Sequence, residues 1–106
     1  IGPLVVSTDE LADRDALRIV CAINGEVRQD GNTSDLIFDV PTLVSFLSSI
    51  TTLVTGDIIF TGTPEGVGMA QGKWLADGDV ITTTIDGLGT MTNRVVRAAD
   101  PRPIRG

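Results

Sequence analysis

The sequence predicts a small α+β fold that is mostly β-structure, with one main helix at about residues 40–50. Two turn signals support the β-structure, because Asn24-Gly25 and the segment 86–89 each lie between two runs suited to strands. The third observation is an apolar stripe with helical spacing in residues 40–50. A chain of 106 residues can hold at most one domain with a single modest core.

The first hairpin is predicted from residues 17–29. Residues 17–23 form an apolar strand, and residues 26–29 form the returning strand. Asn24-Gly25 between them is a strong signal for a two-residue hairpin turn. Before this hairpin, residues 7–10 have the polar composition of a brief helical turn.

The polar segment 30–35 and the helix follow this hairpin. Residues 30–35 predict a solvated turn and not a calcium site, because the segment lacks the length and the closing glutamate of an EF-hand loop. Asp39 is a suitable N-cap, and Pro41 is tolerated in a first helical turn. One helical face then carries the apolar stripe, which we expect to form core and not a partner-binding surface: Val40, Leu43, Val44, Leu47 and Ile50.

The second half of the chain predicts further strands. The short apolar run 58–60 suits a buried strand, and the β-branched run 80–85 suits another. Residues 86–89 make the second hairpin turn, and residues 90–96 alternate well enough to be its returning strand. Residues 97–106 contain two prolines and predict a poorly ordered tail, which leaves residues 1–96 as the domain.

Composition excludes several classes of protein. The formal net charge of −6 argues against nucleic acid or an anionic membrane as partner, because both reward clustered Lys and Arg. No apolar run approaches the roughly 18 residues that a membrane span needs. The single cysteine, Cys21, cannot close an internal disulfide, so we expect a reducing, cytoplasmic environment. The absence of histidine excludes Ser-His and Cys-His catalysis within the chain.

The most informative stretch is residues 61–67, here called the glycine loop. Thr61, Gly62 and Thr63 follow the apolar run 58–60, so hydroxyls and backbone N–H groups lie where a carboxylate or enolate oxygen could be held. The alternative is a turn at a strand end whose hydroxyls satisfy its own backbone, and spacing alone favours that alternative.

Other chemical motifs fail on spacing. Gly72-Lys73 ends a glycine-rich stretch, but neither the Walker spacing nor the dinucleotide-binding spacing of glycines is present. Asp77 and Asp79 flank Gly78, which indicates a turn better than a pair of metal ligands. Spacing alone therefore predicts no complete catalytic or metal site.

The segment from Gly56 to Gly68, Gly-Asp-Ile-Ile-Phe-Thr-Gly-Thr-Pro-Glu-Gly-Val-Gly, resembles the signature of the fumarylacetoacetate hydrolase family. Further matches follow in the order expected of the C-terminal part of that family and cover nearly the whole chain. They are Ile1 to Val6, Ile23 to Glu26, Pro41 to Leu43, Leu75 with Gly78 to Val80, and Gly87 to Gly89 with Asn93.

The resemblance implies a mixed β-roll or barrel-like fold, usually in a homodimer. It further implies an enzyme that binds Mg²⁺, or Mn²⁺ or Ca²⁺ in its place, and that hydrolyses, decarboxylates or isomerises 2-oxo or 1,3-dioxo acids through a metal-stabilised enolate. Acylpyruvate, oxaloacetate and 2-hydroxyhepta-2,4-diene-1,7-dioate are substrates of this type. Thr63 matches a position that contacts the substrate carboxylate in that family, and Gly62 would permit close approach.

One departure from the family pattern concerns the metal. Members carry a Glu-x-Glu pair, a later Asp and an active-site Lys before the part that this chain matches, and no Glu-x-Glu occurs here. The chain also begins with Ile1. We therefore expect the C-terminal part of a longer enzyme, completed by an N-terminal segment or companion chain that supplies the metal ligands. The alternative is a noncatalytic β-domain used for assembly.

Overall fold

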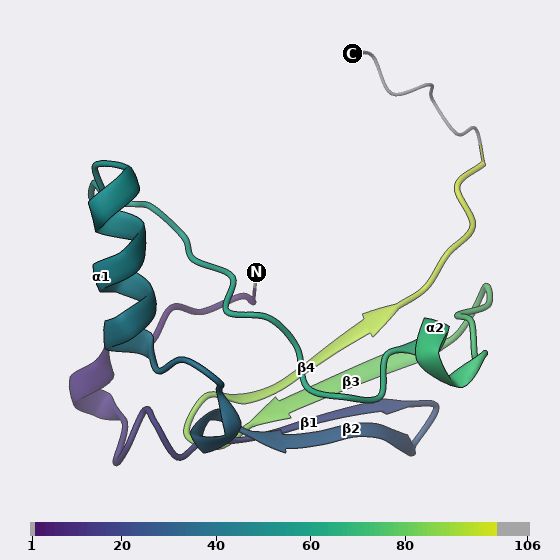
Figure 1. The fold of residues 1–106 in the computed structure, drawn as a ribbon. Helices are drawn as coiled ribbons and strands as arrows, with labels where there is room; N and C mark the ends of the chain where they lie inside the picture. Colours follow the sequence, from purple (N-terminus) through teal and green to yellow (C-terminus); the bar gives the residue numbers. More distant parts are fainter. Residues whose placement is uncertain (1, 100–106) are drawn as a thin grey trace.

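A four-stranded antiparallel sheet is the main element of the computed structural model, which describes residues 2–99 (Figure 1). The strands lie in the order β2-β1-β3-β4, so β1 and β3 occupy the centre of the sheet. Their bounds are Arg18–Ile23 for β1, Glu26–Asn32 for β2, Val80–Ile85 for β3 and Gly89–Arg94 for β4. The α+β class, the β-rich content and the one main helix are confirmed.

The first hairpin, β1 and β2, is confirmed, and its returning strand is longer than predicted. Asn24 and Gly25 have φ of 50° and 83°, as a two-residue turn between twisted strands requires. β2 continues to Asn32, so the prediction of a turn from residue 30 is wrong for its first part. Pairing with β1 and the ion pair between Arg18 and Asp30 hold this polar segment in the sheet. The turn follows as a 3-10 helix, η2, at Thr33–Asp35.

β2 contains a bulge that sequence patterns do not reveal. Cys21 pairs with Gln29, but the next residue of β1, Ala22, pairs with Val27. Arg28 therefore has no partner in β1 and is the extra residue of the bulge. A bulge of this kind breaks the alternation of side chains and re-aims the residues beside it.

The second hairpin, β3 and β4, is confirmed too. β4 ends at Arg94, two residues before the predicted limit of 96. A side-chain network joins this hairpin to the first one, because Asn24 Nδ2 donates to Asp79 Oδ1 at 2.8 Å. The amide of Val80 donates to Asn24 Oδ1 at 2.9 Å, and the Asn24 amide donates to the Val80 carbonyl at 2.9 Å. The turn of the first hairpin is thereby linked to the start of β3, at the open end of the second hairpin.

Asp79 gives this network a dependence on pH. The Ala76 amide donates to Asp79 Oδ2 at 2.8 Å and, with the bond from Asn24, lowers the pKa of Asp79. A carboxylate whose pKa falls on folding stabilises the protein above its unfolded pKa, and this contribution is lost as pH falls through the folded pKa. We therefore expect Asp79→Asn to reduce the acid sensitivity of the melting temperature, measured from pH 7 to pH 3.

Glu10→Gln is the control for this measurement, because it also removes one exposed carboxylate. The Glu10 side chain is exposed and takes no part in the Asp79 network. An equal change in acid sensitivity for the two variants would show that the Asp79 network does not cause it.

The main helix, α1 at Val40–Ile50, begins as predicted. Asp39 Oδ1 accepts a hydrogen bond from the Thr42 amide at 2.8 Å, and Pro41 lies in the first turn. The prediction that its apolar stripe forms core is wrong, since no residue of α1 is buried. The helix stands away from the sheet and has no extensive contact with any strand (Figure 1). Within residues 2–99 the apolar face is therefore only partly covered: Val40, Leu43 and Leu47 are half-buried, and Val44 and Ile50 are exposed.

The prediction of a buried strand at residues 58–60 is also wrong. These residues belong to no helix or strand, and the Phe60 side chain is 81% exposed. A strand requires a neighbour to satisfy its amides and carbonyls, and none lies beside this run in the described part of the chain. The run instead leads the chain from α1 back across the sheet (Figure 1).

Three further observations complete the fold. The predicted helical turn is present as η1 at Thr8–Glu10, and an unpredicted one-turn helix, α2, spans Gly68–Gln71. No helix within residues 2–99 has the length and apolar composition to cross a membrane. The tail predicted at 97–106 lies outside the described residues from position 100 onward.

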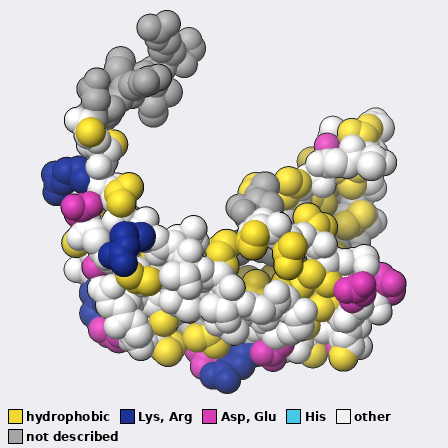
Figure 2. Space-filling view, turned by 180° about the vertical axis from the view of Figure 1, so that it is seen from behind, with side chains coloured by type: hydrophobic (Ala, Val, Ile, Leu, Met, Phe, Trp, Pro, Cys, Tyr) yellow, Lys and Arg dark blue, Asp and Glu magenta, His cyan; other side chains and the backbone are white. Residues whose placement is uncertain are grey.

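Apolar side chains remain exposed throughout this fold. No side chain among residues 2–99 is fully buried, and several large ones are more than half exposed, including Val5, Ile37, Phe46 and Trp74. Figure 2 shows hydrophobic side chains around the hollow between the helix and the sheet. An apolar surface of this extent is typical of an interaction site.

Candidate functional site

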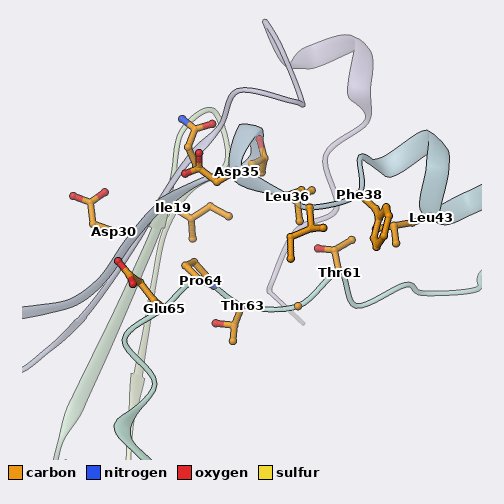
Figure 3. A pocket seen from close by; sticks show the side chains of 15 residues that line it. Ile19, Asp30, Asp35, Leu36, Phe38, Leu43, Thr61, Thr63, Pro64 and Glu65 are labelled. Atoms are coloured by element: carbon orange, nitrogen blue, oxygen red, sulfur yellow. The ribbon is translucent and has the colours of Figure 1, made fainter. Parts of the chain in front are cut away.

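The glycine loop passes beside the bulged strand β2. Gly62 and Gly66 have φ of 107° and 103°, in the region that favours glycine. In Figure 3 Thr61 points toward Leu36 and Phe38, whereas Thr63 leaves the loop on the other side. The two hydroxyls are therefore separated by the turn that Gly62 makes.

A cleft of about 620 Å³ lies between the glycine loop and the rest of the chain (Figure 3). All three predicted site residues, Thr61, Gly62 and Thr63, line it. The opposite walls combine an apolar part with polar residues of β2 and η2. They are Ile19, Asp30 to Thr33, Asp35 to Phe38, and Leu43, and the loop adds Pro64 and Glu65.

Gln29 connects the glycine loop to β2. Its Nε2 donates to Thr63 Oγ1 at 2.8 Å and to the Pro64 carbonyl at 2.9 Å. The Gln29 side chain is half-buried, and the residue lies directly after the bulge at Arg28. The hydroxyl of Thr63 is thus held in place by a residue 34 positions away in the sequence.

Two glycines allow the loop to lie this close to β2. A Cβ on Gly66 would overlap the Arg28 carbonyl oxygen, which the bulge leaves beside the loop. A Cβ on Gly31 would lie 2.9 Å from Pro64 Cβ. At Gly62, by contrast, a Cβ would meet no atom within 4 Å, so the space beside Gly62 is open.

Two carboxylates of β2, those of Asp30 and Glu26, form ion pairs. Arg18 binds Asp30 through both guanidinium and carboxylate edges at 2.8 and 2.6 Å, which lowers the pKa of Asp30. Lys73 Nζ donates to Glu26 Oε1 at 3.0 Å and, with Arg28 nearby, lowers the pKa of Glu26. These pairs are exposed, so they orient the strand more than they stabilise it.

The described residues do not by themselves fit a divalent cation. No three His, Cys, Asp or Glu side chains among residues 2–99 come together as metal ligands would. Asp30, at the cleft, already uses both oxygens for Arg18. The interpretation of Asp77 and Asp79 as turn residues is confirmed, since they accept hydrogen bonds from the amides of Arg97 and Ala76.

Comparison with known families decides the classification of this domain. The sequence model of the Fumarylacetoacetate (FAA) hydrolase C-terminal family matches residues 1–96. The chain belongs to this family. The FAA hydrolase resemblance inferred from the glycine loop and its colinear matches is thereby confirmed.

Relatives and solved structures of the FAA hydrolase family support this assignment. Oxaloacetate tautomerase YisK of Bacillus subtilis (strain 168) is 43% identical over 97 residues, which are 90% of this chain and 32% of that protein. The maleylpyruvate hydrolase of Sphingobium sp. SYK-6, solved with manganese(II) and pyruvate, is 41% identical with a TM-score of 0.82, over 90% of this chain and 34% of that one.

A third relative is the 5-carboxymethyl-2-hydroxymuconate delta-isomerase of Mycobacterium smegmatis. It is 41% identical with a TM-score of 0.80, over 93% of this chain and 36% of that one. The chain thus spans about a third of the length of each of these FAA hydrolase relatives. Family members include hydrolases, isomerases and tautomerases, and a divalent metal is bound in one of them.

Two residues of this FAA hydrolase site were missed by sequence reasoning. Gly31 interrupts a strand, and a glycine there can mark close approach of another backbone, so its role had a usable signal. Gln29 had none. Its partner Thr63 is 34 positions away, and a lone glutamine in a strand is ordinarily a surface residue.

Proposed function

We propose that this chain forms the carboxylate-binding wall of an enzyme that acts on 2-oxo and 1,3-dioxo acids and their enols. The observation that carries the proposal is Thr63, whose hydroxyl lies at the cleft and accepts a hydrogen bond from Gln29. A hydroxyl has one proton to donate, and that proton is free to bind a carboxylate oxygen. Gly62 leaves open space beside it for the substrate.

The named relatives support the class of substrate. Oxaloacetate, maleylpyruvate and 5-carboxymethyl-2-hydroxymuconate each carry a carboxylate beside an oxo or enol carbon. We therefore propose cleavage, decarboxylation or isomerisation of such an acid by the complete cytoplasmic enzyme, as a homodimer with Mg²⁺ or another divalent ion. The ligands of that ion would come from outside residues 2–99, because these residues do not fit a cation.

Within the cleft the described residues have separate tasks. Thr63 donates to the substrate carboxylate, and Thr61 offers a second hydroxyl on the opposite side of the loop. Leu36 and Phe38 form an apolar wall on the side of the loop toward which Thr61 points.

Thr63→Val in the full-length protein tests this function. This change removes the hydroxyl and alters the side-chain volume little. We expect kcat/KM for oxaloacetate or maleylpyruvate to fall roughly 10- to 100-fold, because that factor corresponds to the loss of one hydrogen bond to a charged group. Melting temperature should change little. Thr63→Ser keeps the hydroxyl and should retain most of the activity.

Thr55→Val is the matched control, because Thr55 is exposed and lies outside the cleft. It should leave kcat/KM unchanged. Unaltered turnover in Thr63→Val would remove Thr63 from the site.

A noncatalytic assembly domain is the second candidate function. The exposed apolar side chains and the lack of a metal-ligand cluster among residues 2–99 favour it. In that case Thr63→Val would alter stability alone, and the purified protein would show no metal-dependent turnover of oxaloacetate or maleylpyruvate.

A further inference from the structure

We propose that Gln29 is a positioning residue that fixes the Thr63 hydroxyl as a hydrogen-bond donor toward the substrate. This inference rests on the proposed function and adds a determinant of substrate selection to it. Gln29 itself lies behind Thr63, and it acts on the substrate only through that hydroxyl.

The hydrogen bonds determine how the Gln29 amide is oriented. The Pro64 carbonyl can only accept, so the group 2.9 Å from it must be the NH₂ and not the amide oxygen. The same NH₂ lies 2.8 Å from Thr63 Oγ1, which must therefore accept. One lone pair of the Thr63 oxygen is thus occupied by Gln29, and the hydroxyl proton is directed away from Gln29.

The backbone of β2 explains why Gln29 reaches the loop. Arg28 is the unpaired residue of the bulge, and its carbonyl oxygen lies against Gly66. Gly31, two residues beyond Gln29, lies against Pro64. Strand and loop therefore approach closely on both sides of Gln29, and the half-buried amide is aimed at the Thr63-Pro64 segment between these contacts.

This arrangement selects a ligand with acceptor oxygens. A hydroxyl whose proton is directed away from Gln29 can donate to a carboxylate or an enolate, so it favours a ligand with acceptor oxygens at this point. The cleft would therefore bind the ionised acid in preference to its amide. The selection depends on Gln29, because without it the hydroxyl could rotate and accept.

Gln29→Glu in the full-length protein tests this role. The shape is nearly unchanged, but an ionised carboxylate can only accept, so it would take the Thr63 proton away from the substrate. We expect KM for oxaloacetate at pH 8 to rise about tenfold relative to wild type, with a smaller change in kcat.

The pH profile separates positioning from a structural role. A carboxylate that faces the Pro64 carbonyl has a raised pKa, and its protonated form can donate as the amide does. The ratio of KM between variant and wild type should therefore fall to within about threefold between pH 8 and pH 5. Because the substrate ionises equally in both measurements, its effect on KM cancels in this ratio. Gln29→Leu cannot donate at any pH and should keep its raised KM throughout.

Gln71→Glu is the matched control, since it makes the same change of charge at an exposed position outside the cleft, in α2. Its KM ratio should stay near one at all pH values. A Gln29→Glu ratio near one at pH 8, or a raised ratio that does not fall with pH, would overturn the positioning role.

A double variant distinguishes this role from the proposed function. On a Thr63→Val background, Gln29→Glu should have no further effect on KM, because the hydroxyl that it acts through is absent. A full additional loss would overturn the inference while leaving Thr63 in the site. If Thr63→Val alone leaves kcat/KM unchanged, the role of Thr63 in the proposed function is itself rejected.

Discussion

Replacing Gly66 with alanine should detach the glycine loop from β2 and remove substrate binding. The new methyl group would overlap the Arg28 carbonyl oxygen, and the residue would keep a φ of 103° that alanine rarely adopts. Overpacking and backbone strain together cost on the order of 3 kcal/mol. We expect KM to rise sharply and the melting temperature to fall in thermal unfolding.

Gly56→Ala separates the two causes of this effect. Gly56 has a similar φ of 97°, but a Cβ there would meet no atom within 4 Å. This variant should suffer the backbone strain alone and retain substrate binding. Equal loss of stability and of affinity in the two variants would mean that close approach to Arg28 is not what requires glycine at position 66.

Asn24→Ala should weaken the connection between the two hairpins. The change removes one hydrogen bond to Asp79 Oδ1 and one from the Val80 amide, and it places alanine at a φ of 50°. We expect a loss of stability on the order of 2 kcal/mol, measured by denaturant unfolding of the full-length protein.

Asn24→Gly separates the effect of the lost hydrogen bonds from the effect of the strained backbone. Glycine accepts the left-handed conformation of the turn but cannot form either side-chain hydrogen bond. The free energy of unfolding of Asn24→Gly should lie between those of the wild type and of Asn24→Ala. A glycine variant as stable as wild type would show that the two side-chain bonds contribute nothing.

Local patterns predicted the parts of the fold that depend on local interactions. The two hairpins follow from turn residues such as Asn24 and Gly25 and from adjacent strands, and α1 follows from its Asp39 cap and its apolar spacing. These features need only neighbours in sequence. The family resemblance, carried by the glycine loop, correctly gave the FAA hydrolase assignment as well.

Parts of the fold that depend on distant residues were not predicted. Residues 58–60 have strand composition, but pairing requires a neighbouring strand that residues 2–99 do not place there. The stripe of α1 has core composition, but the described chain covers it only in part and buries none of its residues. The contact between Gln29 and Thr63 depends on a bulge, whose position is set by the register of β1 against β2 and not by composition.

The bulge at Arg28 also bears on the order in which this domain folds. The bulge belongs to a hairpin between neighbouring strands, whereas the hydrogen bonds that fasten the loop to β2 join residues 34 and 35 positions apart. Closing a long loop costs more chain entropy than closing a local hairpin. We therefore expect the hairpin and its bulge to form before the loop and its hydroxyl dock onto β2.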